Sequence, residues 1–125
     1  MPAKGYDKAL NVVRSLCLAL PETSEVEAWG HPTFRAGKKM FAGFGAEAGA
    51  PTLGLKVGFE RQDELLQDDR FYPTPYAAHQ GWVSLVIDDR TDWTEVEGLL
   101  REAYRQVPLK RMLTVSYTHL TLPTN

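Results

Sequence analysis

Hydrophobic residues near the start of the chain recur at helical spacing. They are alternately four and three positions apart, at Tyr6, Leu10, Val13, Cys17 and Leu20. This spacing places them on one side of an amphipathic helix. Pro21 follows at once, and a proline cannot continue a helix that precedes it. The pattern therefore predicts a helix over residues 6–20 with a single buried side.

After Pro21 the hydrophobic period changes from helical spacing to alternation. Residues 26–56 are rich in β-branched and aromatic side chains, and glycine and proline interrupt them at short intervals. Alternation bounded by such residues is typical of strands. We expect strands over 25–29, 33–36, 39–44 and 52–57, and a later one over 82–87. Gly37 and Lys38 suit a two-residue hairpin turn between the second and third strands.

Two further helices are expected in the second half of the chain. The segment after Gly58 has helix-forming residues and ends before the proline-rich stretch 71–76, which we expect to be a loop. Asp92 followed by Glu95 has the spacing of a capping box, and hydrophobic residues continue at helical spacing to Val107. This last helix is the best defined in the sequence.

The order of these elements predicts an α+β two-layer sandwich. The elements follow one another as α-β-β-β-β-α-β-α, and the links between the early strands have hairpin length. Short links favour an antiparallel sheet with the helices on one face. We see no linker, so residues 1–114 are expected to form a single domain. Residues 115–125, VSYTHLTLPTN, resemble translated sequencing-adapter read-through, and we expect them to be a non-native tail.

Composition narrows the possible roles of the protein. The 125 residues carry a formal net charge of −2, which argues against a strongly basic protein that coats nucleic acid. Cys17 is the single cysteine, so no internal disulfide or thiolate metal cluster is possible. No hydrophobic run is long enough to cross a bilayer, and we expect no membrane partner. A reducing cytoplasm is the expected location.

Catalytic and cofactor motifs are not evident. Gly43 and Gly45 superficially resemble a dinucleotide fingerprint, but no helix follows them to hold a pyrophosphate. His31 and His79 have no flanking carboxylates at ligand spacing, so no metal site is predicted. Cys17 lies on the hydrophobic side of a helix, where a buried small residue is expected. The sequence therefore predicts a non-enzymatic protein without a cofactor.

Strand alternation predicts a basic and aromatic sheet face opposite the helices. Alternation turns Phe34, Met40, Ala42, Phe44, Leu53, Leu55, Val57, Val83, Leu85 and Ile87 inward. It turns Arg35, Lys39, Phe41, Gly54, Lys56, Trp82 and Ser84 outward. Cations interleaved with aromatic rings can hold phosphates by charge and bases by stacking. The alternative without a binding function is a solvated face whose lysines discourage edge pairing.

Three blocks of the sequence resemble the MmcQ/YjbR family. They are residues 29–35 (WGHPTFR), 37–42 (GKKMFA) and 81–85 (GWVSL), and the likeness extends over roughly residues 6–113. The resemblance implies a small CyaY-like α+β sandwich, similar to frataxin and to secretion chaperones. Members of the family are commonly labelled DNA-binding through fold similarity, and fold alone does not fix function. The family's recurrent basic and aromatic positions match Trp29, Arg35, Lys39, Phe41, Lys56, Tyr76, Trp82 and Tyr104.

These observations leave three functions open. The first is weak contact of the outward face with nucleic acid such as DNA. The second is binding of a small anionic or aromatic ligand between Trp29, Tyr76 and Trp82. The third is a chaperone-like protein-interaction module that uses the same face. The candidate binding residues common to these hypotheses are Arg35, Lys38, Lys39, Phe41, Lys56, Trp82, Trp29 and Tyr76.

Overall fold

A computed structural model describes residues 5–47 and 49–107; the predicted tail lies outside them. The helices are α1 (Tyr6–Leu18), α2 (Phe59–Leu65) and α3 (Trp93–Arg105), with a short 3₁₀ helix, η1 (Ala78–Gln80). The strands are β1 (Thr23–Ala28), β2 (His31–Ala36), β3 (Lys39–Glu47), β4 (Ala50–Lys56), β5 (Phe71–Pro73) and β6 (Trp82–Val86).

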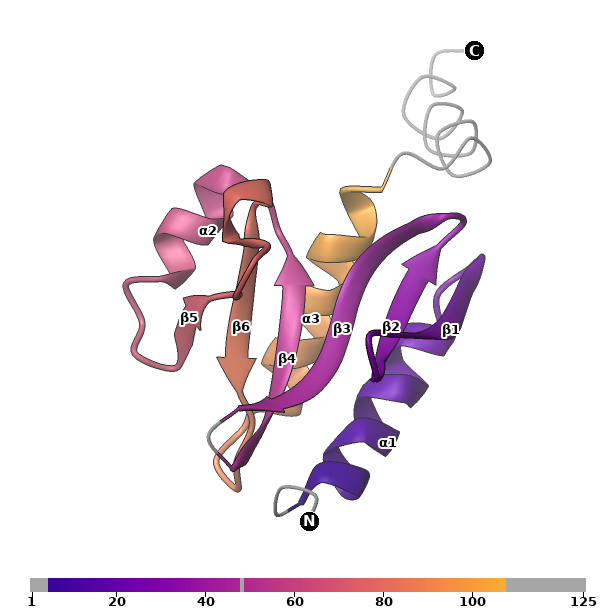
Figure 1. Cartoon of the computed structure of the whole chain (residues 1–125), viewed down its shortest axis with the longest axis horizontal. Coiled ribbons are helices and arrows are strands. Elements are labelled where there is room, and N and C mark those ends of the chain that lie inside the picture. Colours follow the sequence, from indigo (N-terminus) through magenta and orange to yellow (C-terminus); the bar gives the residue numbers. More distant parts are fainter. Residues whose placement is uncertain (1–4, 48, 108–125) are drawn as a thin grey trace.

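The strands form one antiparallel sheet in the order β1-β2-β3-β4-β6-β5. Helices α1 and α3 lie behind this sheet, and α2 lies beside the upper end of β6 (Figure 1). The face turned away from α1 and α3 is called the open face below. An α+β sandwich with an antiparallel sheet is therefore confirmed, as is the two-residue turn at Gly37 and Lys38.

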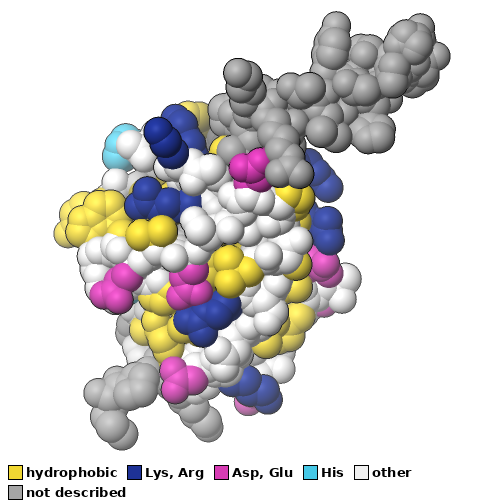
Figure 2. Space-filling model, turned by 90° about the vertical axis from the view of Figure 1, so that its right-hand side faces the viewer, with side chains coloured by type: hydrophobic (Ala, Val, Ile, Leu, Met, Phe, Trp, Pro, Cys, Tyr) yellow, Lys and Arg dark blue, Asp and Glu magenta, His cyan; other side chains and the backbone are white. Residues whose placement is uncertain are grey.

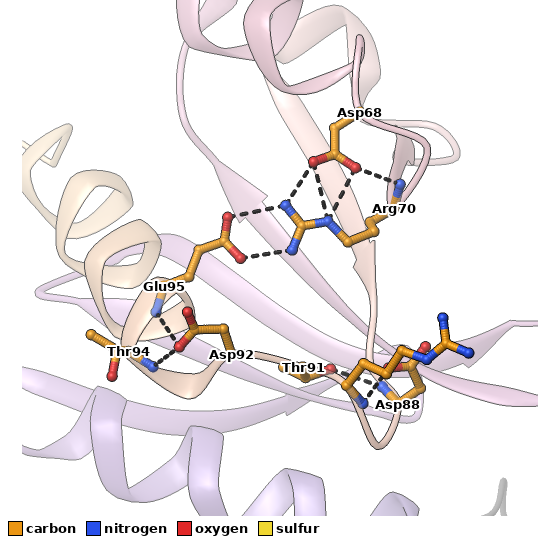
Figure 3. A network of polar contacts seen from close by, with 8 residues as sticks. Asp68, Arg70, Asp88, Thr91, Asp92, Thr94 and Glu95 are labelled. Carbon is orange, nitrogen blue, oxygen red and sulfur yellow. Dashed lines mark hydrogen bonds and ion pairs between the residues drawn. The ribbon is translucent and has the colours of Figure 1, made fainter.

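The N-terminus of α3 is held by the predicted cap and by an ion-pair network (Figure 3). The Asp92 carboxylate accepts hydrogen bonds from the backbone N–H groups of Thr94 and Glu95, at 3.0 and 3.3 Å. The Glu95 side chain instead binds the Arg70 guanidinium, at 2.7 and 3.1 Å. Arg70 also binds Asp68, and its hydrogen bonds lower the pKa of that carboxyl to about 2. The network ties the segment before β5 to the start of α3.

The core lies between the helices and the covered face of the sheet. Helix α1 contributes Ala9, Leu10, Val13 and Cys17, and α3 contributes Val96, Leu99, Leu100, Ala103 and Tyr104. The strands contribute Phe34, Ala42, Phe44, Leu53, Leu55, Val83 and Leu85, all with relative exposures of 2% or less. Burying apolar surface in this way is the main favourable contribution to folding.

Cys17 provides a test of the core because its side chain is fully buried. Burial raises the pKa of its thiol to about 12, so little of the reactive thiolate is present at neutral pH. We expect the native protein to resist a thiol-specific disulfide reagent at pH 8 and the urea-unfolded protein to react fully. Absorbance of the released chromophore measures this, and rapid reaction of the native protein would place Cys17 outside the core.

The predicted orientations of residues 39–41 are wrong because β3 contains a bulge. Phe34 pairs with Ala42 while Arg35 pairs with Met40, so Phe41 is an extra residue in β3. A bulge redirects the side chains around it. Phe41 is fully buried, and its ring centroid lies 5.7 Å from that of Tyr104 on α3. Phe41 therefore belongs to the core instead of the open face.

The same bulge moves two neighbours of Phe41. Met40 pairs with Arg35 and shares the open face with it, because directly opposed residues of paired strands point to the same side. Lys39 pairs with Ala36, which is fully buried under the helices. Lys39 is thus an exposed residue at the rim of the covered face, whereas alternation predicted Met40 inside and Lys39 on the open face.

The sequence predicted that the whole proline-rich stretch 71–76 is a loop, and this prediction is wrong for its first half. Its first three residues form the edge strand β5, which pairs with β6. Phe71 is buried, and Pro73 ends the strand at the sheet edge, a place where proline is tolerated. Three residues are too few to show an alternating pattern, so the sequence carried no strand signal here.

Candidate functional site

Two adjacent rows of residues cross the open face. In the first, Arg35 lies opposite Met40 on one side of the sheet and Lys56 lies opposite Trp82 on the other. Ala42 pairs with Leu55, which brings these two pairs beside each other. The second row runs through small residues, in the order Thr33, Gly43, Gly54 and Ser84.

Trp82 lies on the predicted face but is not available for stacking. A Cβ atom at Gly54 would lie 3.6 Å from Cε3 of the Trp82 ring, so the indole packs against the glycine backbone. Only 8% of Trp82 is exposed. Its carbonyl oxygen accepts a hydrogen bond of 3.0 Å from the Gln62 side chain on α2. Trp82 therefore packs against the sheet and does not offer an exposed ring for stacking.

Four cations lie together at one end of the sheet, and we call this set the basic end: Arg35, Lys38, Lys39 and Lys56. Strands β2 and β4 finish there and β3 begins there, at the upper end of the sheet in Figure 1. Lys38 occupies the turn between β2 and β3, and both it and Lys39 are exposed. Arg35 and Lys56 are partly exposed on the open face.

The basic end gathers cations that lack an ion pair, whereas the other described cations without one, Lys8, Arg90 and Arg105, lie on separate elements. Within the described part of the chain, none of its four residues has a carboxylate within 4.0 Å. Four arginines elsewhere are each paired, with contacts of 2.6–3.2 Å: Arg14 with Glu25, Arg61 with Glu102, Arg70 with Asp68 and Glu95, and Arg101 with Glu97. The charges of the basic end therefore remain available to an external anion.

Arg35 contains an unsatisfied donor. Its Nε atom is buried and has no hydrogen-bond partner among residues 5–47 and 49–107. A buried donor without an acceptor costs free energy, and more so when the group is charged. Because Nε is shielded from solvent, an external oxyanion would bind the exposed part of the Arg35 side chain instead.

Tyr76 is fully exposed at the same end of the sheet. It lies between β5 and β6, and those strands place this connection beside Trp82 and hence near Lys56. Its relative exposure is 99% and its backbone φ is 65°. The Thr74 hydroxyl contacts the Ser84 hydroxyl at 2.9 Å, which anchors the loop to the open face. Tyr76 is thus a free aromatic ring next to the basic end.

Trp29 is equally exposed but lies elsewhere. It forms the two-residue turn between β1 and β2 with Gly30, with a φ of 53° and 86% exposure. This turn is at the opposite end of β2 from Lys38. Of the eight predicted site residues, the structure therefore brings five exposed or partly exposed ones to one end, separates Trp29, and buries Phe41 and Trp82.

The surface view from the β1 side agrees with this distribution (Figure 2). Lysine and arginine side chains lie toward its upper left, beside exposed hydrophobic side chains, and others lie along its upper right edge. Basic and acidic side chains are interspersed over the lower half. A protein with a net charge of −2 thus presents a locally basic region.

A shallow hollow between α2 and the end of α3 is a feature that the sequence did not predict. Its volume is about 480 Å³, and it is lined by Val57, Gly58, Phe59, Glu60, Arg61, Glu102, Arg105 and Gln106. Arg61 is already bound to Glu102 at 2.9 Å across it. No sequence motif marks these residues, because they come from two helices far apart in the chain.

Two kinds of feature are absent from residues 5–47 and 49–107. No three His, Cys, Asp or Glu side chains are grouped so that they could hold a metal ion. No helix in this part of the chain has the length and hydrophobicity needed to span a membrane.

The family profile of YjbR matches residues 18–106. The chain belongs to the YjbR family. The matched region contains the whole sheet, all four residues of the basic end and Tyr76. No curated protein matches the chain significantly.

Solved structures agree with this assignment. A Deinococcus radiodurans protein of the DUF419 domain family is 26% identical, with a TM-score of 0.67, over 76% of this chain and 75% of the other. A Pseudomonas syringae protein is 16% identical, with a TM-score of 0.59, over 70% of this chain and 89% of the other. The second likeness shows a shared fold alone. The YjbR protein described here thus has the α+β sandwich fold that its resemblance to the family implied.

Proposed function

We propose that this YjbR protein is a non-enzymatic protein that binds nucleic acid weakly through the basic end. The observation that carries the proposal is the ion pairing described above. Arg35, Lys38, Lys39 and Lys56 have no carboxylate partner among the described residues and lie at one end of the sheet, whereas the other unpaired cations, Lys8, Arg90 and Arg105, lie on separate elements. Unpaired lysines and arginines on one surface are suited to phosphate groups.

The proposed binding is weak and sensitive to salt. Each neutralised phosphate contributes roughly 0.9 to the logarithmic salt slope for duplex DNA and about 0.7 for a single strand. Four contacts therefore give a slope of about −3 for a single strand. The overall charge of −2 opposes tight non-specific binding.

A small anionic ligand is the second candidate, and the partly exposed Arg35, which has no carboxylate partner among the described residues, favours it. An oxyanion would bind the accessible part of the guanidinium, with Lys56 as a second positive charge on the same face. This candidate predicts that affinity does not rise with oligonucleotide length. It also predicts that inorganic phosphate or a mononucleotide saturates the site with one-to-one stoichiometry.

Fluorescence anisotropy with labelled oligonucleotides at 50 and 200 mM salt tests the proposal. We expect binding that strengthens with oligonucleotide length, and a combined Arg35→Ala, Lys39→Ala and Lys56→Ala variant whose salt slope falls below about 1 in magnitude. The control is Lys8→Ala with Arg90→Ala and Arg101→Ala. It removes three exposed cations from other surfaces, so the change in net charge is the same. Equal weakening by both variants, or no binding by the unmodified protein, would contradict the proposal.

A further inference from the structure

We propose that the nucleic acid bound at the basic end is single-stranded and that a base stacks on Tyr76. This inference rests on the proposed function and specifies its ligand. It follows from the geometry of one exposed ring and from the kind of surface that carries the cations.

The backbone around Tyr76 holds its ring out into solvent. The Thr74 carbonyl oxygen accepts hydrogen bonds from the N–H groups of Ala77 and Ala78, at 3.2 and 3.0 Å, which closes a tight turn around Tyr76. The turn keeps Tyr76 at a φ of 65°, a conformation that costs a side-chain-bearing residue free energy. A fully exposed ring in such a conformation gains nothing from packing within the described structure, so stability does not account for it.

Tyr76 is the most exposed aromatic residue near the basic end, at 99% against 61% for Phe59. Phe41 is fully buried against Tyr104, and Trp82 is 8% exposed and packed on Gly54. Trp29 is exposed but lies at the other end of β2. The two rings that the alternation pattern favoured for stacking are therefore unavailable, and Tyr76 takes that role.

The shape of the surface favours a single strand over a duplex. Duplex reading usually inserts a helix or a two-stranded ribbon into a groove. Here Arg35 and Lys56 lie on the sheet face itself, beside a row of small residues that includes Gly43. On the helices, Arg61 and Arg101 are bound to carboxylates, and the two helical cations without an ion pair among the described residues, Lys8 and Arg105, lie on different helices. An open sheet with flanking cations and a free ring suits unpaired bases and a flexible backbone.

Affinities for a labelled single-stranded oligothymidine and a duplex of equal length, measured at one salt concentration, test the inference. We expect at least tenfold tighter binding of the single strand. Tyr76→Ala should weaken single-strand binding about tenfold, the size expected for one lost stacking contact, and Tyr76→Phe should retain it. The salt slope should stay unchanged in Tyr76→Ala, because that variant removes no charge.

Trp29→Ala is the matched control, since Trp29 is also an exposed aromatic residue with a positive φ. We expect it to bind both oligonucleotides as the unmodified protein does. If neither oligonucleotide binds the unmodified protein, the proposed function itself fails. If both bind equally well, or if Tyr76→Ala binds normally, the basic end binds nucleic acid without this stacking contact and only the present inference is overturned.

Discussion

Replacing Phe41 with alanine is expected to lower the free energy of unfolding by about 3–5 kcal/mol. The side chain is fully buried, and its ring meets Tyr104 edge-on at an interplanar angle of 77°. Truncation would remove this contact and leave a cavity between β3 and α3. An open-face Phe41, as strict alternation predicts, would instead cost about 0.5 kcal/mol or less when replaced. Urea denaturation monitored by circular dichroism measures the difference.

Two companion variants keep this result interpretable. Phe41→Leu retains most of the buried volume and should remain folded even if Phe41→Ala does not. Met40→Ala alters the partly exposed neighbour on the open face and should cost clearly less than Phe41→Ala. A larger loss from Met40→Ala than from Phe41→Ala would show that the bulge, and with it the assignment of the two faces, is wrong.

Gly81→Ala is expected to be the second strongly destabilising substitution. Gly81 has a φ of +86°, which costs an alanine about 1–2 kcal/mol. A Cβ atom there would also lie 3.0 Å from Cα of Gly58, closer than packed atoms tolerate. Crowding of this kind adds about 1–3 kcal/mol. The backbone N–H groups of Val57 and Gly58 both donate to the Gly81 carbonyl oxygen, so the segment cannot move away freely.

Gly30→Ala separates the cost of the positive φ from the cost of crowding. Gly30 has a φ of +79°, but no atom lies within 4 Å of a Cβ built there. It should therefore show the conformational cost without the crowding. Thermal unfolding of both variants measures the comparison, and equal losses at the two positions would refute the close approach of Gly58 and Gly81.

The fold was largely predictable because its main elements have strong periodic signals. The helical spacing through Cys17 and the Asp92 cap both lead to observed helices. Alternation correctly assigned Phe34, Leu55 and Val83 to the buried face. It failed at residues 39–41, since one inserted residue reverses the alternation and a bulge leaves no mark in the hydrophobic pattern.

The sequence was enough to predict which charged residues form the candidate site, but not which aromatic rings are exposed there. Sequence identified Arg35 and Lys56 as outward cations, and the strand pairing places both on the open face. It could not show that Trp82 would pack against Gly54, because that contact depends on the pairing of β4 with β6. The separation of Trp29 from Tyr76 likewise depends on which end of the sheet each loop joins.

Chemical-shift mapping of ¹⁵N-labelled protein with a short single-stranded oligonucleotide tests the central claim most directly. The account predicts that the largest amide shifts fall on Arg35, Lys38, Lys39 and Lys56, that they extend to Tyr76, and that they shrink as salt is added. Amides of the Trp29 turn at the opposite end of β2 should be unchanged. Shifts centred on that turn, or on the hollow between α2 and α3, would contradict the assignment of binding to the basic end.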